Sequence, residues 1–344
     1  MSEPESMLAA VLVRRGEPLS VRSVPKPVPG PGQALVRVRA AGVCHTDLHL
    51  RDGVPDSPPM PLVLGHEIAG EVAAVGSDVD VPIGERVLVY YYDGCGACDW
   101  CRHGLENLCR TPAAKWGFDT DGGFAEYFLA SARCLVPLPA DLSFAGAAVL
   151  GCAGTTAMHV VGAVGKVAAG EDVVVIGAGG VGLAAVQVAI AHGASVIAVE
   201  PHPASRDRAL EYGARLAVDP AAEDVVAAVR TATGGHGCDV VVDTVGNHDT
   251  PGQAVLMAQP QGRVVLVGYT DRPAPVAVVS VVTRETQVLG SVGATLADAR
   301  EAMALAANGS LRGCVADEYP LTGVNDALAR LAGGGVVGRL VLVP

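Results

Sequence analysis

The chain has 344 residues, half of them hydrophobic, which is enough to build two packed domains of ordinary size. Its formal net charge of -12 argues against nucleic acid or an anionic membrane as a partner. The arginines are dispersed and aromatic residues make up 4% of the sequence, so neither a basic patch nor a stacking platform for bases is expected.

The amino-terminal residues bear on the expected compartment. The run Met-Ser-Glu-Pro-Glu-Ser-Met has neither the basic segment nor the apolar core of a secretory signal. We therefore expect a cytoplasmic protein whose nine cysteines remain reduced. Where cysteines cluster, this expectation favours metal binding over disulfides.

The first third of the chain is predicted to be rich in β-strands. Apolar alternation punctuated by Gly and Pro indicates strands at residues 8–13, 19–24, 34–41, 68–75 and 86–92. After about residue 150, short Val-rich runs alternate with Ala-rich segments, a pattern typical of βαβ units around a parallel sheet. Six strands are expected there, at residues 172–176, 195–199, 216–218, 240–243, 264–267 and 288–291. A helix at 296–308 follows, and a final strand at 338–344 is expected to return to the first domain.

Four cysteines stand within fifteen residues, at the spacing Cys-x2-Cys-x2-Cys-x7-Cys. They are Cys95, Cys98, Cys101 and Cys109. Four thiolates on so short a segment can close tetrahedrally on one zinc ion and leave no position for a substrate. Two disulfides are the alternative, but the odd total of cysteines and a reducing compartment favour a structural zinc.

Three further residues match the ligands of an open zinc site. Cys44, His66 and Cys152 each lie in a segment that we predict to be a turn. Two cysteines and one histidine, with the fourth position left to water, bind the zinc in one class of catalytic site. Singly, each residue has an ordinary explanation as a buried thiol or a hydrogen-bonded core histidine. Their combination beside a closed four-cysteine site favours the metal.

A glycine-rich turn follows the first strand of the second region. Residues 177–182 have the sequence Gly-Ala-Gly-Gly-Val-Gly between a predicted strand and a predicted helix, as a dinucleotide-binding turn requires. Gly177 permits the tight turn, Gly179 lets the backbone approach a pyrophosphate, and Gly182 lets the helix pack on the strand. The run 173–191 is long enough to span a bilayer, but its break into strand, turn and helix argues against a membrane segment.

An acidic residue ends the next predicted strand. Glu200 lies 23 positions after Gly177. A carboxylate there accepts hydrogen bonds from the adenosine ribose and repels a 2′-phosphate, which favours NAD over NADP. Arg206 and Arg208 follow closely and leave NADP open.

With these motifs in place, the sequence resembles the zinc-dependent medium-chain alcohol dehydrogenases over nearly its whole length. The resemblance rests on Cys44-His45-Thr46-Asp47, Gly65-His66-Glu67, the four-cysteine segment, Gly151-Cys152, the glycine turn and Val337-Gly338-Arg339-Leu340. It implies an α/β protein, with a GroES-like β-barrel catalytic domain at 1–150 and 292–344 and a doubly wound parallel Rossmann domain at 151–291. It also implies an active site between the two domains and reversible hydride transfer between a primary or secondary alcohol and NAD.

The resemblance further implies a role for individual residues. Cys44, His66 and Cys152 would bind the catalytic zinc, Glu67 would be a transient ligand, and Asp47 would orient His66. Thr46 would hydrogen-bond the substrate oxygen, and His49 would end a proton relay. The expected cofactor contacts are Gly177, Gly179, Gly180, Val181, Gly182, Glu200, His45, Thr156, Val245, Val267 and Arg339. The expected substrate-pocket residues are Tyr91, Val54 and Trp116.

Several alternatives stay open at this point. His45 stands where many relatives carry arginine, so cofactor affinity is expected to be weaker or to depend on pH. Zinc-free relatives that reduce the C=C bond of enones or enoyl thioesters give a second candidate function, although they usually lack the three zinc ligands. A non-catalytic NAD-binding protein is a third. A homodimer or homotetramer is expected through the sheet edge near residues 276–282.

Overall fold

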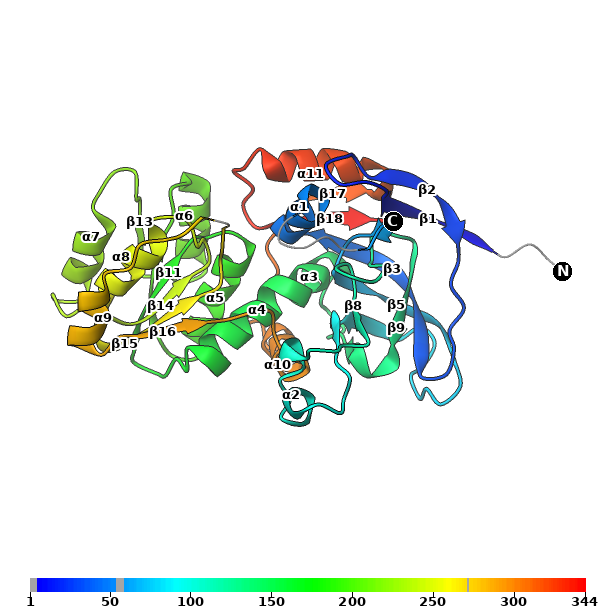
Figure 1. The fold of residues 1–344 in the computed structure, drawn as a ribbon, viewed down its shortest axis with the longest axis horizontal. Coiled ribbons are helices and arrows are strands. Elements are labelled where there is room, and N and C mark those ends of the chain that lie inside the picture. The colour runs from blue at the N-terminus through cyan, green and yellow to red at the C-terminus, as the bar shows by residue number, and fades with distance from the viewer. Residues whose placement is uncertain (1–4, 54–58, 271) are drawn as a thin grey trace. The chain divides into compact units, whose positions relative to one another are not determined.

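The computed structural model describes residues 5–53, 59–270 and 272–344, and the chain divides into two compact units (Figure 1). Unit 1 comprises Met1–Cys152, Thr295–Ala307 and Gly313–Pro344. Unit 2 comprises Ala153–Ala294 and Asn308–Arg312. The chain therefore leaves unit 1 after Cys152 and returns after Ala294. It then makes one short excursion, residues 308–312, that the sequence pattern does not indicate.

Unit 1 is built mainly from antiparallel strands. One seven-stranded sheet runs in the order β10-β6-β5-β3-β18-β17, and β9 also pairs with β3. A second sheet has the order β2-β1-β4, and β7 pairs with β8. The strands are β1 Ser6–Leu12, β2 Ser20–Pro25, β3 Gln33–Val43, β4 Leu62–Val63, β5 Glu67–Val75, β6 Arg86–Val89, β7 Tyr92–Asp93, β8 Ala114–Lys115, β9 Tyr127–Ser131, β10 Leu135–Pro137, β17 Val315–Pro320 and β18 Arg339–Val343.

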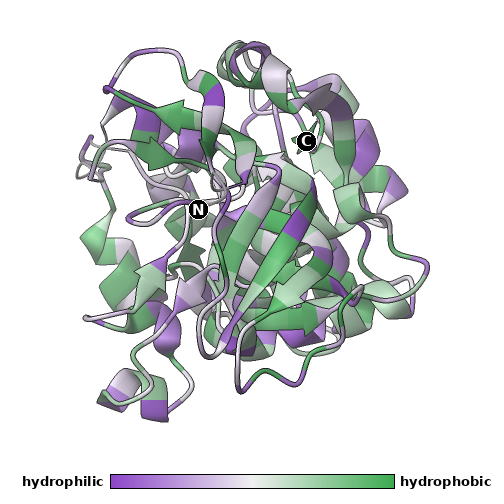
Figure 2. Ribbon diagram, turned by 90° about the vertical axis from the view of Figure 1, so that its right-hand side faces the viewer, coloured by the Kyte–Doolittle hydropathy of each residue, from purple (hydrophilic) through white to green (hydrophobic). Residues whose placement is uncertain are grey.

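The central strand of unit 1 is β3, which pairs with β5, β9 and β18. Apart from Arg37 and Arg39, whose side chains are exposed, nearly all of its residues are buried. Figure 2 shows the long apolar stretches along the strands. β18 lies antiparallel to β3 with Leu340 opposite Val43, so the last strand of the chain pairs with a strand from its first third. This register brings Arg339 close to the carboxyl end of β3, where the candidate site begins.

Unit 2 is a parallel sheet of six strands in the order β13-β12-β11-β14-β15-β16. The strands are β11 Asp172–Ile176, β12 Ser195–Val199, β13 Leu216–Val218, β14 Cys238–Asp243, β15 Ala258–Leu266 and β16 Gln287–Gly290. The helices that follow them in turn are α5 Gly180–Ala191, α6 Pro203–Glu211, α7 Val225–Ala232, α8 Thr250–Met257 and α9 Val278–Arg284. The strand order reverses beside β11, as in a doubly wound dinucleotide-binding sheet, and the predicted fold class is confirmed.

The remaining helices lie outside this βα alternation. They are α1 His45–Asp52, α2 Asp99–Arg102, α3 Phe144–Val149, α4 Thr155–Met158, α10 Leu296–Ala307 and α11 Val324–Ala332, with 3-10 turns at Glu106–Leu108, Ala132–Cys134 and Leu321–Gly323. α3 and α4 belong to one helical run, Phe144–Val164, which also contains two π-helical stretches. By length and composition this run could cross a membrane, but 83% of its apolar window is buried inside the protein. The run 173–191 is instead a strand, a turn and a helix, as predicted.

Candidate active site

The site starts at the carboxyl end of β3. Cys44 is the N-cap residue of α1, and its backbone N–H donates to Oδ2 of Asp47 at 2.7 Å. Because α1 begins here, Thr46 and His49 lie within its first turns and are half-buried, whereas His45 is exposed. The Sγ atom of Cys44 lies 3.6 Å from the Thr46 hydroxyl. One helix start therefore brings the first predicted zinc ligand next to the predicted substrate-binding hydroxyl.

His66 lies in the segment between β4 and β5, directly before Glu67. Its side chain is 1% exposed, and its Nδ1 lies 3.7 Å from Oδ1 of the fully buried Asp47. Among the described residues, neither ring nitrogen of His66 has a hydrogen-bond partner. Asp47 is thus placed to orient the ring through Nδ1, which leaves Nε2 available to a metal ion.

Cys152 lies inside the helical run Phe144–Val164 and not in the turn that we predict from the sequence. The prediction is wrong because Gly151 and Gly154 resemble turn residues, whereas burial of the apolar run stabilises helix here. The helix is locally widened to π-helical hydrogen bonding over Leu150–Gly154, a feature frequent at functional sites. A Cβ on Gly151 would lie 2.7 Å from Cδ1 of Leu88, so glycine lets the helix approach β6 closely.

These elements bring four potential ligands together. Cys44, His66, Glu67 and Cys152 are all buried, and their ligand atoms lie within 4.8 Å of one another. The Nη2 atom of Arg339, a residue of β18, lies 3.0 Å from Oε1 of Glu67. Arg339, for which we expect a cofactor contact, is therefore engaged here by a carboxylate.

The thiolate and carboxylate groups of this cluster favour a positive charge among them. Burial lowers the pKa of His66, but the polar contacts and negative charges of Asp47 and Cys44 outweigh it and raise the pKa to about 10. The hydrogen bond from Cys152 holds the pKa of the Cys44 thiol well below its usual value. Burial raises the pKa of Glu67 to about 8, partly opposed by the charge of Arg339.

The side chains present fit a zinc ion. Two thiols and an imidazole are typical zinc ligands, and the buried, unpartnered Nε2 of His66 would be costly without a ligand. The carboxylate of Glu67 completes the group but is already balanced by Arg339. The residues named from the sequence thus form one compact donor set.

Aromatic rings surround His66. The Tyr91 ring centroid lies 5.3 Å from that of His66, and the Phe118 centroid lies 4.8 Å from it. Tyr91 and Phe118 also stack on each other at 5.8 Å. Phe118 was missed from the sequence because its segment carries no motif and no periodic pattern. Of the predicted pocket residues, Tyr91 lies against the site and Val54 lies outside the described residues.

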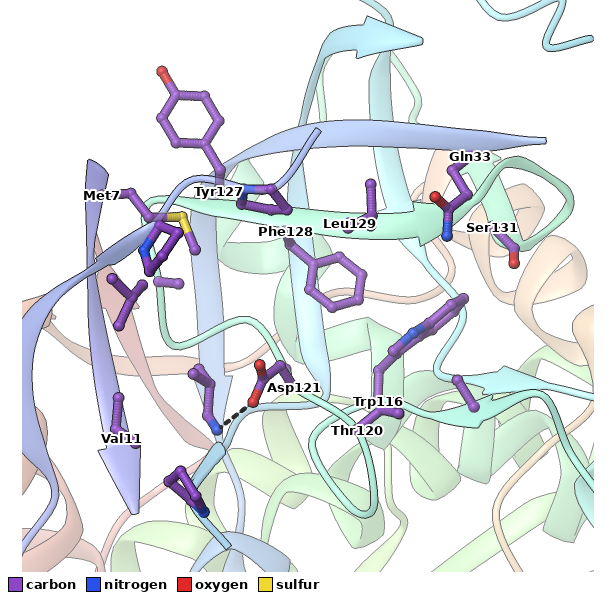
Figure 3. Close-up of a pocket in the computed structure, with 18 of the residues that line it drawn as sticks. Met7, Val11, Gln33, Trp116, Thr120, Asp121, Tyr127, Phe128, Leu129 and Ser131 are labelled. Carbon is purple, nitrogen blue, oxygen red and sulfur yellow. Dashed lines mark hydrogen bonds between the residues drawn. The ribbon is translucent and has the colours of Figure 1, made fainter. Parts of the chain in front are cut away.

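Trp116 lies next to a different cavity. Its ring meets the Phe128 ring edge-on at 5.4 Å, and it lines a cavity of about 640 Å³ in unit 1 (Figure 3). Met7, Asp121 and Tyr127 are among the other lining residues, and none of the four clustered ligands is. The structure therefore gives no support to the substrate-pocket role expected for Trp116.

The four-cysteine segment forms a second donor group. Cys95, Cys98, Cys101 and Cys109 have their sulfur atoms within 4.8 Å of one another. The Cys95–Cys101 and Cys98–Cys109 sulfur pairs are 3.9 and 3.8 Å apart. A tetrahedral zinc with Zn–S bonds of ~2.3 Å requires sulfur separations of about 3.8 Å, so the group fits a closed zinc site. The backbone N–H groups of Ala97 and Cys98 point at Cys95 Sγ and lower its pKa to about 6, which favours the thiolate.

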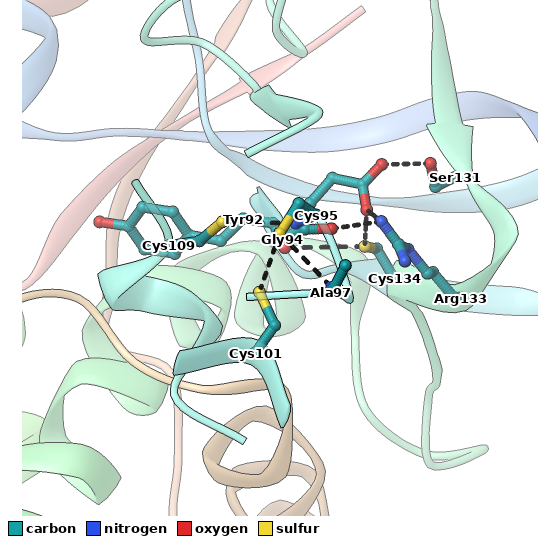
Figure 4. Close-up of polar contacts among 10 residues, drawn as sticks. Tyr92, Gly94, Cys95, Ala97, Cys101, Cys109, Ser131, Arg133 and Cys134 are labelled. Atoms are coloured by element: carbon teal, nitrogen blue, oxygen red, sulfur yellow. Dashed lines mark hydrogen bonds and ion pairs between the residues drawn. The ribbon is translucent and has the colours of Figure 1, made fainter. Parts of the chain in front are cut away.

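A buried carboxylate attaches this segment to the sheet (Figure 4). Asp93, 3% exposed, accepts hydrogen bonds from Arg133 Nε at 2.7 Å and from the Ser131 hydroxyl. The Arg133 guanidinium also donates to the carbonyl oxygen of Gly94 at 2.5 Å. The first turn of the four-cysteine segment is therefore fixed by groups from the end of β9 and the turn that follows it.

The glycine turn of unit 2 lies between β11 and α5. A Cβ on Gly177 would lie 2.6 Å from the Thr244 hydroxyl, and one on Gly182 would lie 1.8 Å from the Gly177 carbonyl oxygen. Both positions therefore need glycine for the chain to pack, whether or not a ligand is bound. A Cβ on Gly179 would meet nothing within 4 Å, so the protein alone does not require that glycine, whereas a close ligand would. Gly180 and Val181 form the start of α5, whose free N–H groups suit a phosphate.

The other predicted cofactor residues of unit 2 lie at two places. Val245 and Val267 follow the carboxyl ends of β14 and β15, where ligands bind in such sheets. The buried Asp243 holds this edge together, because its Oδ1 accepts the N–H groups of Val245 and Gly246 at 3.0 Å. Thr156 is buried in α4.

Comparison with known proteins places the chain in a family. The alcohol dehydrogenase GroES-like domain matches residues 30–140, and the zinc-binding dehydrogenase domain matches residues 180–308. An alcohol dehydrogenase of Geobacillus stearothermophilus is 37% identical over 342 residues, which cover 98% of this chain and 99% of that protein. The crystal structure of AibC superposes with a TM-score of 0.93 at 38% identity, covering 99% of this chain and 97% of that one.

A crystal structure of an NAD-dependent alcohol dehydrogenase is similarly close, with a TM-score of 0.93, 32% identity, and coverage of 98% of this chain and 100% of that one. Identity above 30% over almost the entire length, together with both domain matches, establishes the common ancestry of the two units with these enzymes. The chain belongs to the zinc-dependent medium-chain alcohol dehydrogenase family.

Proposed function

We propose that the chain is a zinc-dependent alcohol dehydrogenase that transfers hydride reversibly between a primary or secondary alcohol and NAD. The observation that carries the proposal is the buried cluster of Cys44, His66 and Cys152, in which Nε2 of His66 has no hydrogen-bond partner among the described residues. The names of the relatives, alcohol dehydrogenase and NAD-dependent alcohol dehydrogenase, support it.

The chemistry divides between the metal and the chain. A zinc ion held by Cys44, His66 and Cys152 would supply Lewis acidity at the substrate oxygen. The chain must then move a proton out of a buried site. Thr46 would hydrogen-bond the substrate oxygen, and His49, on the same helix, would end the relay towards solvent. Asp47 would keep the ring of His66 in place.

The walls of the site favour apolar substrates. Tyr91 and Phe118 present stacked rings beside His66, and the three rings contact one another directly. Such a wall suits aromatic and aliphatic alcohols better than polyols. A cysteine as third ligand, where polyol relatives carry a carboxylate, supports the same substrate class.

We propose two zinc ions per chain, one in the cluster and one in the four-cysteine segment. Metal analysis of the purified protein should give about two zinc ions per chain. Cys98→Ser should remove one of them and lower stability, whereas Cys44→Ser should remove the other and leave the four-cysteine site filled. Two zinc ions retained in either variant would contradict the assignment.

The cofactor is proposed to be NAD. Glu200 follows β12 next to the glycine turn, and its carboxylate would accept the ribose hydroxyls and repel a 2′-phosphate. The cytoplasm is proposed as the compartment, because all nine cysteines are free thiols that lie in the proposed metal sites or at buried positions.

A homodimer or homotetramer is proposed through α9 and β16. β16 is an edge strand of the parallel sheet, and the helix before it exposes Val278, Val279 and Val282 at 68–69%. An edge strand beside apolar side chains is a typical site of self-association.

The test is product analysis after incubation with NADH and cinnamaldehyde, which offers both a C=O and a C=C bond. Cinnamyl alcohol is expected. The saturated aldehyde would favour the enone-reductase alternative and overturn the proposal. Cys44→Ser should abolish turnover and leave NADH binding nearly unchanged. Turnover that survives this change would show that the cluster is not the catalytic centre.

A further inference from the structure

An arginine near the end of β12 already has a carboxylate partner. Arg206, on α6, donates from Nη1 to the backbone carbonyl oxygens of Glu200 and Pro201 at 2.8 and 2.7 Å. Its Nη2 lies 2.9 Å from Oδ2 of Asp219. The two side chains are 18% and 27% exposed, so the pair is largely shielded from water. The positive charge of Arg206 is thus balanced and its direction fixed.

This pair lies where the adenosine end of a dinucleotide is expected. The Oε2 atom of Glu200 accepts the N–H of Ala178, inside the glycine turn, at 2.7 Å. Asp219 follows β13, which is the neighbour of β12, and the Glu200 N–H donates to the Val218 carbonyl at 3.0 Å. The ends of two adjacent strands therefore hold one guanidinium between a backbone and a carboxylate.

We infer that Asp219 determines cofactor choice by holding Arg206 in this ion pair. An arginine at this position of a dinucleotide-binding sheet can accommodate the 2′-phosphate of NADP. Here a phosphate would have to displace a carboxylate and approach two negative charges, Asp219 and Glu200, at short range. Asp219 is a positioning residue in this account, and the inference rests on the proposed dinucleotide-binding function.

A second arginine does not replace the first. Nε of Arg208 lies 3.0 Å from Oε2 of Glu211, and its guanidinium lies 5.8 Å from the centroid of the Tyr212 ring. Because Arg208 is engaged elsewhere, Arg206 is the arginine whose release should shift binding towards NADPH. The variant Asp219→Asn removes the charge but keeps an Oδ1 atom that can accept the Ala221 N–H, at 2.9 Å in the native turn.

The experiment measures the dissociation constants of NADH and NADPH from the fluorescence of the bound dihydronicotinamide. This readout needs no turnover, so its result does not depend on which alcohol is the substrate. Asp219→Asn should tighten NADPH binding roughly tenfold and leave NADH within about twofold. The matched control is Asp207→Asn, an exposed residue of α6 that loses the same charge, and it should change neither constant appreciably.

Two further variants test whether the tighter NADPH binding depends on Arg206. Arg206→Ala in the Asp219→Asn background should abolish the gain for NADPH, because the gain depends on the freed guanidinium. Asp219→Ser, whose hydroxyl can also accept the hydrogen bond of the turn, replaces Asp219→Asn in the measurement if the asparagine variant folds poorly. The inference is overturned if the ratio of the NADPH and NADH dissociation constants is the same in Asp219→Asn as in the control. It is also overturned if the tighter NADPH binding survives without Arg206. A wild-type protein that binds neither nucleotide would instead overturn the proposed function.

Discussion

The buried ion pair between Arg339 and Glu67 offers a direct measure of the electrostatics of the site. The Arg339 side chain is 5% exposed and that of Glu67 is fully buried. Replacing Arg339 by leucine leaves the Glu67 carboxylate without its counter-ion, so at pH 9, above the Glu67 pKa of about 8, we expect the free energy of unfolding in urea to fall by about 3–5 kcal/mol.

A surface pair of equal length provides the control. Arg39 lies 3.0 Å from Glu71, but the two side chains are 40% and 32% exposed. Arg39→Leu should cost no more than about 1 kcal/mol, because water already screens both charges. Equal losses in the two variants would show that burial does not strengthen the Arg339 pair.

A buried thiol on β14 gives a dependence on pH. Burial raises the pKa of Cys238 to about 12, above the ordinary value of 9.0 that it regains on unfolding. The neutral thiol therefore contributes stability below pH 9, and this contribution is lost as the pH rises towards 12. Between pH 8 and pH 10, the wild-type protein should lose about 1.5 kcal/mol more than Cys238→Ala.

The measurement is urea unfolding of both proteins at several pH values in that range. The other ionising groups are common to both chains and cancel in the difference. Iodoacetamide should also leave Cys238 unmodified in the folded protein at pH 8.5, because the reactive thiolate is scarce. Parallel stability curves for the two proteins would contradict the assignment.

At the residue scale, sequence reasoning works where side-chain chemistry is distinctive. Cys44, His66 and Cys152 can be grouped from their residue types because few side chains bind zinc, and the fold brings them together. Phe118 could not be found in this way, because its closeness to His66 depends on the path of the loop between β8 and β9. The pair of Arg206 and Asp219 likewise arises from strands that only the sheet makes neighbours.

At the scale of elements, the four-cysteine segment is attached to a distant helix. The carboxylate of Glu106, between the third and fourth cysteines, accepts the backbone N–H of Leu296 at the start of α10. A negative charge at a helix N-terminus stabilises the unpaired N–H groups there. Glu106→Ala should therefore cost about 1 kcal/mol and speed amide hydrogen exchange in the first turn of α10.

Metal removal should have a related effect on the same helix. A chelator that strips the four-cysteine segment should increase exchange at the start of α10, because Glu106 loses its fixed position. Glu301→Ala, an exposed change on the same helix, is the control and should leave exchange in the first turn unchanged. If the amide hydrogens of α10 stay protected both in Glu106→Ala and after chelation, the stability of this helix does not depend on the four-cysteine segment.

The elements differ in how well the sequence predicts them. The strands of unit 2 could be placed because buried parallel strands are continuous Val-rich runs, and β11, β12 and β13 begin and end as predicted. β17 was missed, since none of the residues in its sequence Val-Ala-Asp-Glu-Tyr-Pro is buried and two adjacent acidic residues interrupt the apolar pattern. The helical run around Cys152 was missed because small residues and glycines obscure its helical period.

At the scale of the whole molecule, the exposed valines of α9 predict the oligomeric state. Val279 and Val282 are 69% and 68% exposed on the helix that precedes the edge strand β16. The double change of both residues to aspartate should place charges in the proposed interface and halve the mass in solution, to one chain from a dimer or to two chains from a tetramer. Val28→Asp, at an 83% exposed position of unit 1, is the control.

Light scattering coupled to size-exclusion chromatography gives the mass directly. An unchanged mass for the double variant, with native circular dichroism, would exclude α9 as the contact. A reduced mass for the Val28→Asp control would show that the effect is not specific to this helix.

The interleaved order of the chain has a consequence for synthesis on the ribosome. β3 needs β18 as its partner, and β18 emerges only after all of unit 2 has been made. The six strands of unit 2, in contrast, come from one continuous stretch and can close as soon as it is exposed. β3, one of the first strands to leave the ribosome, is thus among the last to be fully paired. During that interval, the open side of β3 is the part of the nascent chain that a chaperone would need to shield.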